Sequence, residues 1–292
     1  MKIIEPKVEL LSEIGISPES HIARCSRICY GRENKEPNQE ADKKMVDGLI
    51  KRGHLSMLRH ASVYFYNIED FPDYLKWRII HSDYWNNNMK YGYASTNFQE
   101  FENFEKLVEN EADGDCILAI DEGLFLKECA KHPKLFELYR MTFCITTQIS
   151  TSRELNRCSP NAIAERSTRY CSSKDGLEIC RPWWFKHSIE DITKGNCTYA
   201  EKWYYDNMIN TEEVYKVLLD TNMKPEDARG ILPLDTATKV IYTYSIKEWQ
   251  HILDLRYYDK TGKAHPNVHI VMQMVKDQIN NFVKEHNIDY QV

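Results

Sequence analysis

The spacing of apolar and polar residues along the chain predicts both helices and strands. Apolar residues that recur every three or four positions are typical of helices, whereas strict alternation or a short apolar run is typical of strands. The predicted helices cover residues 19–29, 42–52 and 199–221, and the last of them is amphipathic. The predicted strands cover residues 62–67, 143–149 and 236–244.

Capping and proline signals mark where further elements begin. Ser245, followed by a glutamate three residues later, is a capping box that predicts a helix start, and Pro225 is well placed as a first helical residue. Thr151 and Glu154 have the same spacing, which predicts a second capping box at the start of a short helix. Pro160 cannot continue that helix, so we expect a loop after it.

The helix predicted after Ser245 places a charge on its apolar face. Trp249, Ile252, Leu253 and Arg256 fall on one side of it. A buried arginine is costly unless it is paired, so we expect Arg256 to meet an anion, a carbonyl or a ligand. The alternative is that Arg256 lies at a frayed helix end and reaches water.

The chain contains no repeat, no low-complexity tract and no obvious linker, which favours a single domain over residues 1–292. An insertion is expected at about 70–140, with helices near 100–110 and 120–140. Its aromatic and amide-rich part, residues 77–93, is expected to serve packing rather than ligand binding, because aromatic side chains mostly fill cores.

Composition narrows the class of protein. A net charge of −6 argues against a nucleic acid polymer as partner, although a local basic pocket for a mononucleotide remains compatible with it. The nine cysteines form no paired CxxC clusters, so we expect reduced thiols in a cytoplasmic protein, without disulfides or a metal site. The charged start is no signal peptide, and no apolar run is long enough to span a membrane.

The segment 154–170 is rich in groups that bind anions. Arg157, Arg166 and Arg169 keep their charge at any working pH and match phosphate oxygens with two-pronged geometry. They therefore predict an anion clamp beside the turn at Pro160. The alternative is a solvated surface turn with scattered charges.

The same segment resembles the signature motif of the flavin-dependent thymidylate synthases. In that family Arg-His-Arg precedes a variable stretch and then Ser-x-Arg, commonly within Glu-Ser-Thr-Arg-Tyr-Cys. Residues 167–171 follow the end of the motif, and Arg157 lies on its first arginine. Cys158 stands at the histidine position and Ser159 at the second arginine, two positions that the family uses on its flavin.

Three further segments resemble the family in the same order along the chain. Residues 53–60 resemble Gly-His-x-Ser/Thr-x-x-Glu-His, with Arg59 in place of the glutamate. Residues 229–234 resemble its Ala-Arg-x-x-Leu-Pro block, and residues 255–256, with 264–266 downstream, resemble its Leu-Arg and Ala-His-Pro elements. The resemblance covers roughly residues 20–67 and 141–284.

The resemblance implies an α+β fold with a central, mostly antiparallel sheet flanked by helices and interrupted by a largely helical insertion. It also implies a homotetramer with shared active sites. The residues implied for the nucleotide are Glu154, Arg157, Glu165, Arg166, Ser167, Thr168, Arg169, Arg229 and Arg256. Of these, Arg256 is the implied catalytic residue, because a fixed cation beside the pyrimidine ring stabilises negative charge that develops there. Ser167 is expected to bind phosphate rather than act as a nucleophile, since no histidine is placed to deprotonate it.

The prediction of a flavin cofactor rests on the resemblance alone, because the sequence has neither a Gly-x-Gly-x-x-Gly turn nor a P-loop. The residues implied for FAD are His54, Ser56, Arg157, Cys158, Ser159, Ser245, Lys247 and His251. NADPH and 5,10-methylenetetrahydrofolate are the implied co-substrates.

The predicted function is reductive methylation of dUMP to dTMP. One alternative is transfer of a methyl or hydroxymethyl group to another pyrimidine nucleotide, such as dCMP. A second is a non-catalytic nucleotide-binding paralogue that has lost flavin. Conventional thymidylate synthases attack the pyrimidine with a cysteine, but Cys158 lacks their Pro-Cys-His context and is expected to substitute for the histidine by packing.

Overall fold

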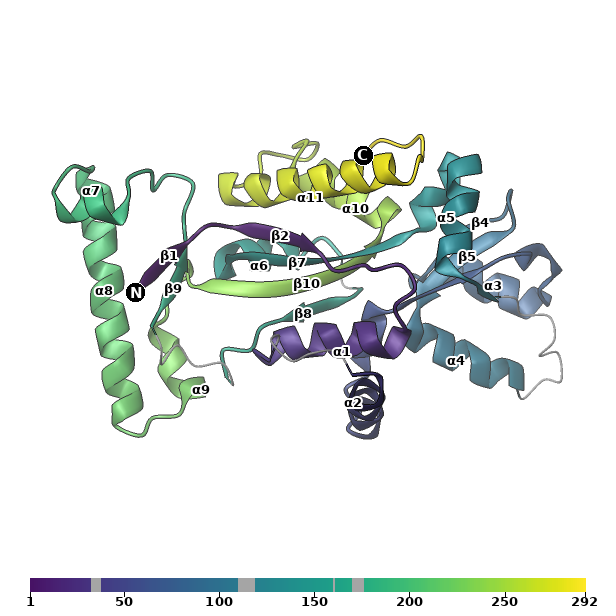
Figure 1. The fold of residues 1–292 in the computed structure, drawn as a ribbon, viewed down its shortest axis with the longest axis horizontal. Coiled ribbons are helices and arrows are strands. Elements are labelled where there is room, and N and C mark those ends of the chain that lie inside the picture. The colour runs from purple at the N-terminus through teal and green to yellow at the C-terminus, as the bar shows by residue number, and fades with distance from the viewer. Residues whose placement is uncertain (33–37, 110–118, 160, 170–175) are drawn as a thin grey trace.

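Two long strands, β7 (Arg140–Gln148) and β10 (Ala237–Ser245), form the centre of the computed structural model (Figure 1). The structure describes residues 1–292 except 33–37, 110–118, 160 and 170–175. The two strands pair along their whole length, from Ala237 opposite Gln148 to Ser245 opposite Arg140. Every residue of β7 is buried, because helices cover both faces of this pair.

Shorter strands complete the main sheet, and all of its pairs are antiparallel. Its order is β2 (Lys7–Leu10), β7, β10 and β8 (Ile163–Glu165). A separate parallel pair joins β1 (Lys2–Ile4) to β9 (Glu178–Cys180). The predicted α+β fold with a mostly antiparallel central sheet is therefore confirmed.

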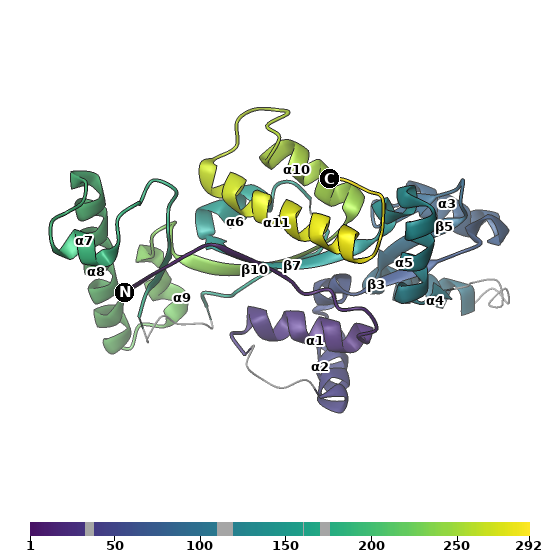
Figure 2. The same cartoon turned by 45° about the horizontal axis from the view of Figure 1, so that its top comes forward.

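Helices cover the two faces of the main sheet (Figure 2). One face carries α6 (Ile149–Leu155), α10 (Ile246–Arg256) and α11 (Pro266–Glu285), and the other carries α1 (Pro18–Cys29) with α2 (Gln39–Lys51) beside it. The core beneath α10 and α11 includes the buried side chains of Trp249, Leu253 and Val271. Burial of this apolar surface is the main stabilising term for the layer arrangement.

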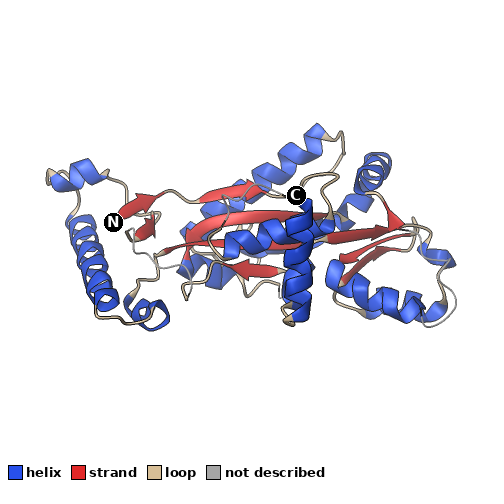
Figure 3. Ribbon diagram, turned by 60° about the horizontal axis from the view of Figure 1, so that its bottom comes forward, coloured by secondary structure: helices blue, strands red, loops and turns tan. Residues whose placement is uncertain are grey.

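A second antiparallel sheet lies at one end of the molecule (Figure 3). Its order is β4 (Trp85–Asn88), β5 (Tyr93–Asn97), β3 (Ser62–Phe65) and β6 (Ala119–Ile120). The helical elements around it are η1 (Leu55–His60), η2 (Ile68–Asp70), α3 (Asp73–His81), α4 (Phe98–Glu109), α5 (Glu122–Lys131) and η4 (Pro133–Leu138). The strands β4 and β5 were not predicted. The single-domain organisation with an insertion stays a prediction.

The opposite end of the molecule consists of α7 (Ile189–Thr193), the long α8 (Tyr199–Asp220), α9 (Pro225–Ala228) and η5 (Arg229–Ile231) (Figure 1). The predicted helices over 19–29, 42–52 and 199–221 are confirmed within three residues. Across the ranges that the structure describes, no helix combines the length and the apolar character that crossing a bilayer needs.

The start of α6 corrects one prediction. The capping box at Thr151 is wrong, because β7 runs directly into a helix that begins at Ile149. The Thr151 hydroxyl instead donates to the side chain of Gln148 at 2.9 Å. The loop expected after Pro160 also contains a short strand, β8, which pairs with β10. Local spacing could not show either feature, since both depend on the neighbouring strands.

Two buried histidines flank a pair of threonines at the centre of the main sheet. His21 Nε2 lies 3.0 Å from Thr142 Oγ1, the two threonine hydroxyls are 2.8 Å apart, and His60 Nδ1 lies 2.9 Å from Thr243 Oγ1. Burial, with the charge of Arg24 nearby, lowers the pKa of His21 to about 4, and burial lowers that of His60 to about 3. Both imidazoles are therefore neutral in the folded protein near pH 7.

These histidines predict a loss of stability in mild acid. The unfolded chain takes up protons as the pH falls below about 6.5, whereas the folded chain does not until about 4 or 3. Stability is therefore fully present above pH 6.5 and falls below it, by on the order of 2 kcal/mol per histidine at pH 5. Urea unfolding at pH 7.5 and pH 5 measures this, and His60→Gln should flatten the pH dependence. An equal flattening by His81→Gln, a change at an exposed histidine, would contradict the assignment.

Candidate active site

The pairing of β7 with β10 directs two helices toward each other. Because the strands are antiparallel, α6 leaves one end of the pair and α10 leaves the other. Both helices pack against α11 on the same face of the sheet. A strand pair of this length spans about 30 Å, while α6 and α10 rise about 10 and about 16 Å. Their last turns therefore meet above the middle of the strands.

Arg256, the last residue of α10, contacts the end of α6. Its Nη1 lies 3.3 Å from Glu154 Oε1, and its Nη2 donates to the Glu154 carbonyl at 3.5 Å. Its Nε donates to Cys158 Sγ at 3.3 Å. The guanidinium thus meets an anion and a carbonyl, as predicted for a charge on an apolar face. Its side chain remains 20% exposed, so a ligand can approach the same group.

Arg169 and Arg229 lie in a second cluster, around α9. Arg169 donates to Glu226 Oε2 from Nε at 3.1 Å and from Nη2 at 2.9 Å. Arg229 donates from Nη1 to Thr168 Oγ1 at 3.0 Å. The hydrogen bonds from Arg169, together with its charge, lower the pKa of the Glu226 carboxyl. These cations are therefore fixed at an exposed surface, where a phosphate can compete with Glu226 for them.

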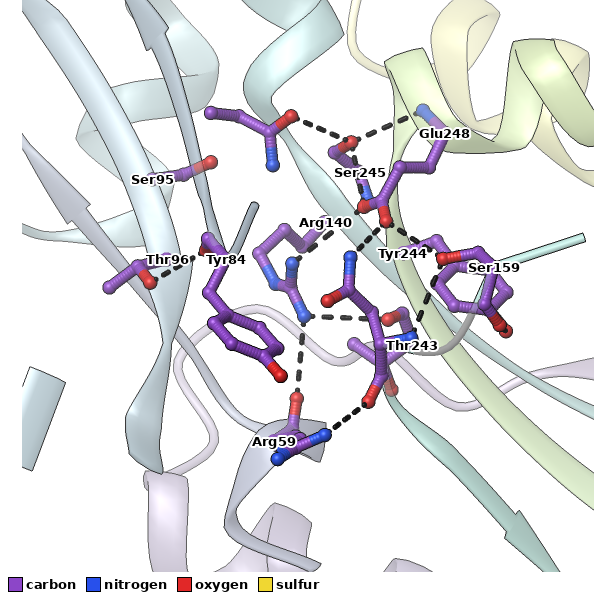
Figure 4. A network of polar contacts seen from close by, with 12 residues as sticks. Arg59, Tyr84, Ser95, Thr96, Arg140, Ser159, Thr243, Tyr244, Ser245 and Glu248 are labelled. Carbon is purple, nitrogen blue, oxygen red and sulfur yellow. Dashed lines mark hydrogen bonds and ion pairs between the residues drawn. The ribbon is translucent and has the colours of Figure 1, made fainter. Parts of the chain in front are cut away.

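Glu248, in the first turn of α10, is the centre of a third cluster (Figure 4). Its Oε1 accepts from Ser159 Oγ at 3.1 Å and from Asn161 Nδ2. Its Oε2 accepts from the backbone N–H of Ser245 at 2.9 Å and from the Ser245 hydroxyl at 3.0 Å. The capping box predicted at Ser245 is therefore confirmed, and its glutamate also holds Ser159 and Asn161 against α10.

Arg140 lies next to this carboxylate and is buried. Its Nη1 is 4.0 Å from Glu248 Oε2, and its Nη2 donates to the carbonyls of Arg59 at 3.3 Å and Thr243 at 3.4 Å. Burial lowers the pKa of Arg140, and the negative charge of Glu248 opposes that shift. A buried guanidinium needs such partners, so Arg140 ties the η1 segment to β10.

Arg59 extends the network from the family position that usually holds glutamate. Its Nη1 donates to the Asn161 carbonyl at 3.3 Å, and its Nε donates to Gln99 Oε1 at 2.8 Å. Its guanidinium also lies 5.0 Å from the ring centroid of Tyr84. The second sheet contributes Asn86, whose Oδ1 lies 3.3 Å from the Ser245 hydroxyl oxygen. Residues from the predicted insertion therefore contact the candidate site.

The remaining residues predicted for the nucleotide or the flavin differ in how far their side chains are exposed. Glu165 accepts from Ser152 Oγ at 2.8 Å, and Ser167 Oγ accepts from the backbone N–H of Arg169 at 3.2 Å. Exposed residues whose side chains make no polar contact within the described part of the chain are His54, Ser56, Arg157, Lys247 and His251. Arg166 is half-buried.

Sequence reasoning missed Arg140, Asn161 and Glu226. No sequence pattern distinguishes Asn161 and Glu226 from ordinary surface residues, because their partners lie far away in the chain. Arg140 carried a weak signal, because it lies three residues before the predicted buried strand 143–149. A charge beside such a strand needs a partner, and that partner is Glu248.

Comparison with known proteins gives matches over much of the chain. The model of the family described as thymidylate synthase complementing protein matches residues 83–283. A flavin-dependent thymidylate synthase of Synechocystis sp. is 25% identical over 152 residues, which are 49% of this chain and 69% of that protein. A probable flavin-dependent thymidylate synthase of Paramecium bursaria Chlorella virus 1 is 27% identical over 151 residues, 48% of this chain and 68% of that protein.

Among solved structures, a UMP/dUMP methylase, PolB from Streptomyces cacaoi bound with 5-Br dUMP, aligns with a TM-score of 0.43. The two sequences are 15% identical, and the alignment covers 97% of this chain and 93% of that one.

The Glu248 cluster predicts a large cost for removing one carboxylate. Glu248→Ala leaves Arg140 without its counter-ion and removes four hydrogen bonds, so we expect a loss of about 2–4 kcal/mol in the free energy of unfolding. Urea denaturation measures it. The control is Glu190→Ala, which breaks an exposed pair with Lys194 and should cost below about 0.5 kcal/mol. Equal effects of the two changes would contradict the role of Glu248.

Proposed function

Because this chain belongs to the thymidylate synthase complementing protein family, we propose that it methylates C5 of the uracil ring of dUMP to give dTMP. One relative named above is called a flavin-dependent thymidylate synthase and the other a probable flavin-dependent thymidylate synthase, which supports this reaction class. The substrate and the co-substrates are part of the proposal.

The observation that carries the proposal is the position of Arg256. Its guanidinium is held by Glu154 and lies beside Cys158, at the start of the predicted anion-binding segment. C5 of uracil needs enolate-like electron density before it can attack a one-carbon unit, and this activation places negative charge on the ring oxygen and N3. A preorganised cation stabilises that charge more in the transition state than in the ground state, and this lowers the barrier.

The phosphate of the nucleotide would bind the cations around α9. Arg169 and Arg229 are exposed and already oriented by Glu226 and Thr168. A phosphate dianion offers more acceptor oxygens than the Glu226 carboxylate, so it would displace this carboxylate from Arg169. Arg157 and Arg166 would complete the clamp, and Glu165 would orient the nearby backbone. Arg256 would then hold the pyrimidine ring, while Arg169 and Arg229 hold the phosphate of the same nucleotide. These arginines would come from one subunit or from two subunits of the proposed homotetramer.

The residues predicted for flavin fit it in part. The side chains of His54, Ser56, Lys247 and His251 are exposed, and their donors are open to a ligand. These residues would hold FAD, which would supply the redox step of the methylation together with NADPH and methylenetetrahydrofolate as co-substrates. Ser245 and Ser159 direct their hydroxyls to Glu248 instead. The N-terminus of α10 is therefore occupied by a carboxylate of the chain itself.

The contact of the Glu248 carboxylate with the start of α10 favours one competing function, a nucleotide-binding protein without flavin. The Glu248 carboxylate accepts from the backbone N–H of Ser245, and the Ser245 hydroxyl accepts from the backbone N–H of Glu248, so the chain itself uses two N–H groups that could otherwise meet an anionic group. The two functions differ in one direct observation. The active enzyme should bind FAD, with flavin absorbance that bleaches with NADPH and recovers when dUMP and methylenetetrahydrofolate are added. Protein that binds dUMP and cannot take up FAD would select the competing function.

Replacing Arg256 should separate chemistry from binding. Arg256→Ala should lower kcat by about 100-fold, because one transition-state donor is lost, with a smaller change in the Kd of dUMP. Steady-state kinetics and dUMP titration measure the two quantities. The control is Arg153→Ala, an exposed arginine of α6, which should leave kcat unchanged. Unaltered kcat in Arg256→Ala would exclude the proposed role.

Replacing Cys158 tests whether the thiol is a nucleophile. If Cys158 only packs against Arg256, Cys158→Ser should retain turnover within about threefold, since the serine hydroxyl can still accept from the guanidinium. Product formation measured by mass spectrometry decides this, with Cys197→Ser as the control. Complete loss of turnover with flavin retained would instead identify Cys158 as the attacking group.

A further inference from the structure

We propose that a groove beside α11, outside the candidate active site, binds a planar aromatic anion. The groove has a volume of about 640 Å³, which lies within the range of small-molecule sites. The residues that line it include Arg181, Trp183, Lys186 and Ser188, together with Met274 of α11. We call it the Trp183 groove. None of its lining residues belongs to the sets predicted for the nucleotide or the flavin.

The parallel pairing of β1 with β9 creates one wall of the Trp183 groove. Parallel strands end at the same edge, so Glu5 after β1 lies beside Arg181 after β9. The backbone N–H of Arg181 donates to the Ile4 carbonyl at 2.8 Å, and its Nε donates to the Glu5 carboxylate. The position of this cation is therefore set by the backbone ladder.

The guanidinium of Arg181 is held in a fixed orientation. Its Nη1 donates to the carbonyls of Phe185 at 3.3 Å and His187 at 3.2 Å. Its centre lies 5.5 Å from the centroid of the buried Phe185 ring. Within the described residues, Nη2 of Arg181 donates no hydrogen bond. This rigid donor edge, at a side chain that is 25% exposed, is suited to an anionic oxygen.

Trp183 supplies an aromatic surface next to this cation. Its side chain is 43% exposed, while its backbone N–H donates to Asn267 Oδ1 at 2.8 Å and so fixes the residue against α11. Lys186 Nζ lies 5.8 Å from the ring centroid of Trp183. The indole supplies a flat apolar face for stacking, and the nearby ammonium supplies a positive charge for an anionic substituent of the ligand.

Charge decides the class of ligand. Arg181 and Lys186 bring two positive charges to the groove and Glu5 brings one negative charge, which leaves an excess of one positive charge. Planarity and a carboxylate or phosphate are thus the required features. Two kinds of compound share them: a mononucleotide, and an aryl carboxylate such as p-aminobenzoylglutamate.

Equilibrium dialysis with AMP and with p-aminobenzoylglutamate tests the proposal and distinguishes these two sources. Wild-type protein should bind at least one of these two compounds with a Kd below about 1 mM. Trp183→Ala should weaken this binding about tenfold, because stacking on the indole is lost. The matched control is Trp203→Ala, which removes another exposed tryptophan, 61% exposed on α8, and should leave binding unchanged.

A second variant tests the charge requirement. Lys186→Gln should weaken the same probe about threefold and reduce the dependence of Kd on salt. Circular dichroism melts verify that each variant is folded, and Trp183→Phe should restore most of the binding. The proposal is overturned if neither probe binds or if Trp183→Ala binds the probe like wild type. It is also overturned if dUMP displaces the probe equally from wild type and Trp183→Ala, because the probe would then occupy the nucleotide site.

Discussion

The full-length antiparallel pairing of β7 with β10 is the constraint on which the arrangement of the molecule depends. It fixes where α6 and α10 begin, and so it brings Glu154 and Arg256 together although they are far apart in sequence. It also places Thr142 opposite Thr243, between the two buried histidines. A slip of one residue would turn every side chain of β7 to the opposite face, which would bury the wrong set.

The charge pair of Arg140 and Glu248 connects the two central strands to the candidate site. A cation and a carboxylate in the interior are costly to desolvate, and the cost is offset only when each has several partners. Glu248 meets that condition with Ser159, Asn161 and Ser245. The same contacts hold Ser159 and Asn161, so Ser159, which departs from the family motif, belongs to a connected network.

Departures from the family motif also involve the second sheet. Arg59 replaces the usual glutamate, and it contacts Tyr84, Gln99 and the carbonyl of Asn161. Residues from the predicted insertion therefore help to position a segment that lies far downstream in the chain. This arrangement gives a physical reason for changes at several motif positions to occur together.

The sequence predicted those features that depend on local spacing. The helices α1, α2 and α8, the strands β7 and β10 and the capping box at Ser245 follow from periodicity and capping residues. The false capping box at Thr151 and the missed short strands, among them β4, β5 and β8, depend on pairing with distant segments, which no local pattern contains. In the same way, the apolar face of α10 predicted a partner for Arg256, but only the fold shows that Glu154 is this partner.

The central claim is that the arginines of this chain hold one pyrimidine monophosphate. A crystal structure of the purified protein with dUMP tests it most directly. The account predicts that the phosphate lies within hydrogen-bond distance of Arg169 and Arg229 and that the uracil ring lies beside Arg256, within one subunit or across two. A nucleotide bound away from Arg256, or these guanidinium groups spread too far apart to reach one ligand, would contradict the account.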